Sequence, residues 1–209
     1  IIENVYTSRW SGGSYSPDGS QIAFSANVQG ADPYNDSSIF IANADYTDLH
    51  EIPDTHGTRS PAWGPDGEWL ALSISKIVDT DIGIIHPDGS DFHILEYTGE
   101  LGPVGCFGDA HEWSPDSTML VTTAGCALTG KINIVVLSLN NSQIVLELDY
   151  PVKCGQRPLA FAPDGQHIIQ IASTCDGWEL INITTGEAQP YTGDEFPIWG
   201  TSQVSPQWG

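Results

Sequence analysis

Short apolar segments alternate with polar turns along the whole chain. Four of these segments follow a proline-containing turn, and four more open a second hairpin further along. The first group is 21–24, 68–71, 118–121 and 166–169, and the second is 38–42, 81–85, 132–136 and 178–181. Apolar segments of this length, bounded by Gly, Pro, Asp and Asn, are typical of β-strands. The pattern predicts an all-β chain without a long helix.

The turn that precedes the first group occurs four times. Its copies are Ser16-Pro17-Asp18-Gly19, Gly64-Pro65-Asp66-Gly67, Ser114-Pro115-Asp116-Ser117 and Ala162-Pro163-Asp164-Gly165, with prolines 48, 50 and 48 residues apart. Proline presets φ, aspartate accepts local amide hydrogen bonds and glycine tolerates positive φ, so each copy predicts a tight link between antiparallel strands. Ser117 replaces the glycine of the third copy, where a left-handed backbone costs about 1 kcal/mol.

A repeat of this length with two hairpins in each copy predicts the four-stranded antiparallel blades of a β-propeller. The predicted units are 10–57, 58–107, 108–155 and 156–204, with a partial fifth unit at 205–209, all in one domain over 1–209. A β-sandwich is disfavoured because both hairpins recur in phase four times. An aromatic residue precedes every turn and is predicted to wedge between blades: Tyr15, Trp63, Trp113 and Phe161.

The repeat resembles the WD-like propellers of the TolB type. Those blades carry a Ser-Pro-Asp-Gly turn followed by an Ile-Ala-Phe-Ser-like strand, and residues 16–25 of this chain match that pattern. The resemblance covers essentially the whole chain. It implies the propeller fold, but such repeats serve binding modules, assembly proteins and non-catalytic domains of peptidases alike.

The two ends of the chain suggest an incomplete circle. Residues 205–209 repeat the pattern of 60–64, as the inner strand of a further blade, while Ile1–Thr7 has the pattern of an outermost strand that closes the circle. The favoured interpretation is an excerpt of a propeller of about six or more blades. The alternative is that a neighbouring chain supplies the missing strands, which gives self-assembly by strand addition.

The charge is strongly negative. There are 27 acidic and 6 basic residues, for a net charge of −21. Nucleic acids and anionic membrane surfaces are bound through Lys and Arg clusters, so neither is an expected partner. No segment approaches the roughly 20 apolar residues of a membrane helix, so membrane insertion is not expected. The acidity is compatible with a solvated surface or with a cationic partner.

Four cysteines occupy equivalent positions in the third and fourth units. Cys106 and Cys126 flank one turn, and Cys154 and Cys175 flank the next. This placement predicts disulfides Cys106–Cys126 and Cys154–Cys175, each worth roughly 3 kcal/mol in the chain-entropy model. Free thiols or one zinc site are the alternatives, although the chain lacks the close Cys-x-x-Cys pairs of zinc sites.

Three glycosylation sequons begin at Asn35, Asn140 and Asn182. With the paired cysteines and scarce lysine, they favour an exported protein, extracellular or at the cell surface, because disulfides persist in oxidising compartments. A periplasmic location is the alternative and would give the disulfides without glycans.

The chain lacks recognisable catalytic motifs. There is no Gly-x-Ser-x-Gly elbow, no phosphate-binding glycine loop, and no second histidine after His111-Glu112 to complete a zinc motif. We therefore predict no catalytic residues, no cofactor and no metal. His50, His86, His93 and His167 fall on predicted strands or hairpins and receive no role.

The candidate binding residues lie where loops enter the innermost strands. Arg59, Asp109 and Arg157 each stand six residues before a turn proline, and His56 and His111 share the first two of these loops. Trp10 and Trp199 fall in loops outside the aromatic register and are candidates for ligand stacking. A polar funnel of this kind suits a peptide carboxylate or another anionic ligand. The alternative is that the arginines satisfy polar groups between blades.

These observations predict a non-catalytic exported propeller that binds a protein, peptide or glycan partner or acts as a scaffold. One alternative is the gating propeller of a prolyl-oligopeptidase-like hydrolase whose catalytic domain lies outside this sequence. The other is a structural subunit of an extracellular polymer, completed by strand exchange.

Overall fold

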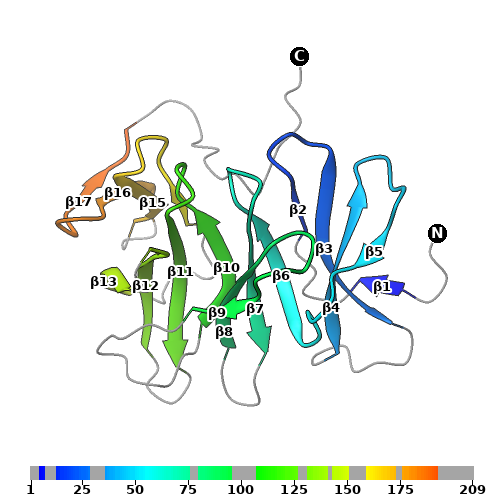
Figure 1. The fold of residues 1–209 in the computed structure, drawn as a ribbon. Coiled ribbons are helices and arrows are strands. Elements are labelled where there is room, and N and C mark those ends of the chain that lie inside the picture. The colour runs from blue at the N-terminus through cyan, green and yellow to red at the C-terminus, as the bar shows by residue number, and fades with distance from the viewer. Residues whose placement is uncertain are drawn as a thin grey trace. The chain divides into compact units, whose positions relative to one another are not determined.

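The computed structural model describes residues 5–7, 13–28, 36–75, 80–95, 107–126, 131–140, 143–150, 159–172 and 176–192. All regular elements in these ranges are β-strands, and they form four antiparallel sheets (Figure 1). The structure divides into two compact units, with the first two sheets before residue 96 and the last two after it.

The first unit contains two sheets. The first sheet consists of β1 (Val5–Thr7), β2 (Gly13–Tyr15), β3 (Gln21–Val28), β4 (Ser37–Asn43) and β5 (His50–Glu51). The second runs in the order β6 (Thr58–Trp63), β7 (Leu70–Ser75), β8 (Thr80–Ile85) and β9 (His93–Ile94). Each sheet follows chain order from an inner strand to a short outer one.

The second unit also contains two sheets, and both are four-stranded and follow chain order. The third sheet consists of β10 (Phe107–Trp113), β11 (Met119–Cys126), β12 (Lys131–Ser138) and β13 (Gln143–Tyr150). The fourth consists of β14 (Ala160–Phe161), β15 (His167–Ile171), β16 (Trp178–Asn182) and β17 (Ala188–Pro190). The prediction of two hairpins per unit is confirmed in all four sheets.

The N-terminal strand pairs differently from the prediction. Val5–Thr7 was expected to close the circle as an outermost strand, but β1 pairs with β3, with Val5 opposite Val28 and Thr7 opposite Ala26. The strand β2 pairs with the other half of β3, from Phe24 to Ile22. The expectation was wrong because an alternating pattern identifies a strand but not its partner, and β3 is long enough to accept both neighbours.

The four repeated turns share one backbone geometry. In each, the N–H of the fourth residue donates to the carbonyl of the first, over 2.8 to 3.0 Å. The aspartate Oδ1 also accepts the N–H two residues further on, at Ser20, Glu68, Thr118 and Gln166. The four turns therefore share one conformation although their first and fourth residues vary, as the repeat predicted.

The carboxylate of Asp18 takes part in the closure of the first turn. Ser16 Oγ donates to Asp18 Oδ1 over 2.6 Å, and this bond, with those from Ser20, lowers the pKa of Asp18 to about 2. An aspartate in the unfolded chain has a pKa of about 3.9. Folding therefore favours the ionised form, and this stabilising effect is complete above about pH 4 and is lost as the pH falls through about 2.

Replacing Ser117 by glycine is expected to raise the free energy of unfolding by about 1 kcal/mol. Ser117 has φ of 59°, while Gly19, Gly67 and Gly165 occupy the same position with φ of 65° to 76°. Glycine adopts this left-handed backbone without the Cβ clash that serine incurs. Urea unfolding monitored by circular dichroism measures the change, and Ser117→Ala, which keeps the Cβ, is the control. A stability gain equal to that of the control would contradict the explanation.

A separate apolar core lies between the two sheets of each unit. In the first unit it contains Ala23, Ile39, Ile41, Ile52, Trp63, Leu70, Leu72 and Ile85. In the second it contains Val121, Ile134, Val136, Leu159, Phe161, Ile168, Ile181 and Ile183. Trp63 and Phe161, both 3% exposed, come from the aromatic position before the turn, and Trp113 is 2% exposed. These three residues are buried as predicted, so they are not available to stack on a ligand.

Candidate binding surface

In two sheets the inner strand is bulged at a similar distance before its turn. The register with the second strand shifts between Arg59 and Ala62 in β6, and between Phe107 and His111 in β10. Such bulges bend a strand and redirect side chains, and they are frequent beside binding sites. We call this end of each sheet, opposite the repeated turns, the loop end.

The bulge of β6 contains a strained residue. Ser60 has φ of 54°, a left-handed backbone that serine adopts only at a cost of about 1–2 kcal/mol. It is flanked by Arg59, which pairs with Ser73, and by Pro61 before the regular pairing resumes at Ala62. Backbone strain of this kind persists where the surrounding structure requires it, and it is concentrated at functional sites.

The side chain of Arg59 extends across its own sheet. One guanidinium nitrogen, Nη2, donates to Thr80 Oγ1 over 3.2 Å, which brings the side chain from β6 past β7 to the start of β8. The residue is half-buried at the loop end. This contact agrees with the interpretation in which the arginine satisfies polar groups of the framework. A guanidinium has five N–H donors, and the Thr80 bond uses one of them.

His56 and His111 occupy different environments. His56 lies in the link between β5 and β6, with 72% of its side chain exposed, and its Nε2 is 3.6 Å from Asp36 Oδ1. His111 is 4% exposed in β10, and its Nδ1 is 3.3 Å from Thr122 Oγ1 on the adjacent strand. His56 is accessible to a ligand, whereas His111 supports the interior of the third sheet. Asp109 lies within the bulge of β10.

Several predicted residues lie outside the described ranges: Trp10, Arg157, Trp199, Asn35, Cys106, Cys154 and Cys175. Cys126 is the last residue of β11. Phe107, the neighbour of Cys106 in sequence, pairs with Ala124, two residues before Cys126. Both disulfides stay predictions.

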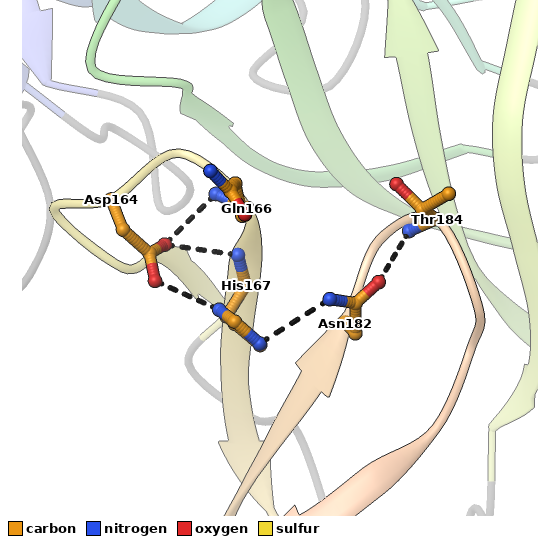
Figure 2. A network of polar contacts seen from close by, with 5 residues as sticks. All are labelled: Asp164, Gln166, His167, Asn182 and Thr184. Atoms are coloured by element: carbon orange, nitrogen blue, oxygen red, sulfur yellow. Dashed lines mark hydrogen bonds and ion pairs between the residues drawn. The ribbon is translucent and has the colours of Figure 1, made fainter.

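The turn end of the fourth sheet carries a polar network that sequence reasoning missed (Figure 2). His167 Nδ1 donates to Asp164 Oδ2 over 2.8 Å, and Asn182 Nδ2 donates to His167 Nε2 over 3.4 Å. These two contacts hold the imidazole between the turn and the neighbouring strand. Partial burial raises the pKa of Asp164, but the Gln166 N–H and the two His167 donors outweigh it and hold the pKa below its ordinary value. The sequence did contain a signal for the Asp164–His167 contact, because His167 follows this turn aspartate by three residues.

The same network bears on the sequon at Asn182. Asn182 Oδ1 accepts the N–H groups of Thr184 and Thr185, over 2.9 and 3.0 Å, while its Nδ2 faces His167. Its side chain is half-buried, whereas Asn140 is exposed just after β12. Of these two sequons, the described geometry favours Asn140 as a glycan acceptor.

A second missed feature surrounds Trp69 in the second sheet. The His86 ring stacks on the indole with centroids 3.8 Å apart, and the His93 ring meets it edge-on at 5.6 Å. His86 Nδ1 donates to the Glu68 carbonyl over 2.6 Å. The histidines thus cover the indole and tie the two hairpins of the sheet together.

The described part of the chain contains neither the ligand cluster of a metal centre nor a membrane-spanning helix. Within the described ranges, no three His, Cys, Asp or Glu side chains converge as metal ligands. Among the same residues there is no helix of the length and hydrophobicity needed to cross a bilayer.

Comparison with solved structures places these sheets in a known fold. No protein-family model and no curated protein matches the chain. A putative TolB from Agrobacterium tumefaciens superposes with a TM-score of 0.62 and 17% identity, covering 85% of this chain and 63% of that protein. The β-propeller domain of the Trilobed protease from Pyrococcus furiosus gives 0.63 and 13%, covering 92% and 58%. The chain has a TolB-like β-propeller fold.

An enzyme is also among the structural matches of this propeller. Oligogalacturonate lyase from Vibrio parahaemolyticus superposes with a TM-score of 0.66 and 13% identity, covering 91% of this chain and 55% of the lyase. The chain spans less than two thirds of the length of each of the three proteins. At these identities the likeness shows the fold alone, and the three proteins do not share one function.

Proposed function

We propose that the chain is a non-catalytic binding or scaffolding part of an exported β-propeller, which recognises a protein or peptide partner at the loop end of its blades. The observation that carries the proposal is the recurrence of the inner-strand bulge in the second and third sheets, with Arg59 at one bulge and Asp109 at the other. Repeated strand distortion at one end of otherwise regular sheets positions polar side chains for recognition.

The rest of the structure supplies rigidity. Hydrogen-bonded turns close the opposite end of each sheet, and buried apolar cores hold the sheets of each unit together. A rigid framework lowers the entropic cost of ordering a binding surface. More of the free energy of the polar contacts therefore remains as binding affinity. Equivalent cysteine placement in the third and fourth units supports export to an oxidising compartment.

The experiment is a selection of random peptides on the immobilised 209-residue chain, followed by calorimetry of the selected peptides. Arg59→Gln is compared with Glu68→Gln, which also removes one charge from the second sheet but at its turn end. The proposal requires saturable binding that Arg59→Gln weakens about tenfold or more and Glu68→Gln leaves unchanged. Both variants must keep the unfolding midpoint of the parent chain, so that weaker binding reports the loss of a contact and not a loss of folding.

Two outcomes would contradict the proposal. If Arg59→Gln and Glu68→Gln weaken peptide binding equally, the binding site is not at the loop end. Cleavage of selected peptides or of oligogalacturonate by the chain, measured by mass spectrometry, would show that it is catalytic.

A second function is favoured by the match to the Trilobed protease, whose propeller is one domain of a protease. In that case the propeller is the accessory domain of a hydrolase. The parent reading frame decides between the two, because a flanking Gly-x-Ser-x-Gly elbow favours the accessory role.

A further inference from the structure

The outer strand of the third sheet differs from the other three. The outer strands β5, β9 and β17 are 2, 2 and 3 residues long, whereas β13 is 8 residues long. Short outer strands are a common protection against pairing with other chains, because they present few unpaired backbone groups. Among the described residues, β12 is the only strand partner of β13. Among the outer strands that the structure describes, β13 is therefore the one with a long edge.

The register shows which backbone groups face this edge. Leu139 N–H donates to the Thr118 carbonyl over 2.9 Å, so odd-numbered residues of β12 bond to β11 and even-numbered ones bond to β13. Leu146 and Leu148, the partners of Val136 and Ile134, therefore direct their N–H and C=O groups inward. Glu147 and Asp149 direct theirs outward.

A bulge limits the regular part of the edge. Val136 pairs with Leu146 but Leu137 pairs with Ile144, so Val145 is an extra residue in β13, and it is 43% exposed. From Leu146 to Tyr150 the pairing with β12 is continuous. This stretch presents a regular strand edge.

Side chains on the two faces of β13 differ in character. On one face, Leu146 and Leu148 pack against the core of the second unit, and a Cβ on Gly186 of the fourth sheet would be 3.4 Å from Leu148. On the other face, Glu147 Oε1 accepts a hydrogen bond from the buried Asn133 Nδ2 over 2.6 Å. The carboxylate is thereby held on the sheet surface beside the outward backbone groups.

We propose that β13 is a docking edge for an extended peptide with alternating basic and apolar side chains. Backbone pairing with Glu147 and Asp149 supplies the hydrogen bonds of an added strand, and the basic side chains lie on the Glu147 face. The negative charge of the chain favours a basic peptide over a second copy of the chain as the partner. Two copies paired about the strand centre bring Glu147 beside its counterpart, and each chain has a net charge of −21. The site is separate from the loop end and does not depend on the proposed function there.

The experiment is an NMR titration of the ¹⁵N-labelled 209-residue chain with a blocked hexapeptide of alternating lysine and valine. Glu147→Pro is compared with Glu147→Ala. Both remove the carboxylate and its bond to Asn133, but only proline removes the outward N–H, at an edge position where proline is tolerated. We expect Glu147→Pro to bind at least tenfold more weakly than Glu147→Ala, with unchanged unfolding midpoints.

The peptide is varied in the same series. In an antiparallel added strand the lysines lie opposite Glu147 and Asp149, and their backbone N–H groups bond to β13. Replacing these lysines by glutamate, or methylating their backbone nitrogens, is expected to abolish the shifts of the Glu147 and Asp149 amides. Equal affinities of the two protein variants, or of the methylated and unmethylated peptides, would overturn the proposal. Sedimentation showing that the chain alone self-associates, and that Glu147→Pro prevents it, would also overturn it by assigning the edge to a second copy.

Discussion

Replacing Trp63 by alanine is expected to lower the free energy of unfolding by about 3–5 kcal/mol, the range for a large aromatic residue truncated in a core. Trp63 is 3% exposed and packs in the cluster between the first two sheets. Its indole Nε1 also donates to the Gly67 carbonyl over 3.3 Å, so the side chain supports the repeated turn as well as the core. Alanine would leave a cavity and an unpaired acceptor.

Chemical denaturation followed by far-ultraviolet circular dichroism measures this effect without relying on tryptophan fluorescence. Tyr46→Ala is the control, because Tyr46 is 78% exposed at a hairpin tip and its loss is expected to change stability by less than about 0.5 kcal/mol. A loss below about 1 kcal/mol for Trp63→Ala would show that this cluster does not hold the two sheets together.

The second largest effect is expected for Thr55→Val, a loss of about 1–3 kcal/mol. Thr55 is fully buried in the link between β5 and β6. Its Oγ1 accepts the Ile39 N–H over 3.1 Å and donates to the Ile52 carbonyl over 2.8 Å. Valine keeps the shape of the side chain but leaves the Ile39 N–H without an acceptor in a place that water does not reach.

The control for this substitution is Thr47→Val. Thr47 Oγ1 donates to Asp45 Oδ1 over 2.6 Å at an exposed hairpin tip, where water replaces the lost bond. Hydrogen exchange gives a second measurement, since Ile39 N–H is expected to exchange faster in Thr55→Val. Equal stabilities of the two variants would contradict the role assigned to the buried hydroxyl.

Sequence reasoning located the strands and turns because their signals are local. Proline, aspartate and glycine act within one turn, and the left-handed backbone of Ser117 follows from its place in the repeat. It did not anticipate that Arg59 reaches Thr80, that His111 is buried against Thr122, or that His167 bridges Asp164 and Asn182. These contacts join residues on different strands, and a strand's sequence does not specify the register of its neighbour.

The amino-acid sequence by itself determined the class of the fold, the number of described sheets and the aromatic positions that enter the cores. These follow from a spacing of 48 to 50 residues and from short-range turn chemistry. Only the tertiary structure decided that β1 joins the first sheet, that β6 and β10 are bulged at the loop end, and that β13 is long while the other outer strands are short. The physical reason is that pairing and burial depend on residues distant in the chain, whose positions no local pattern records.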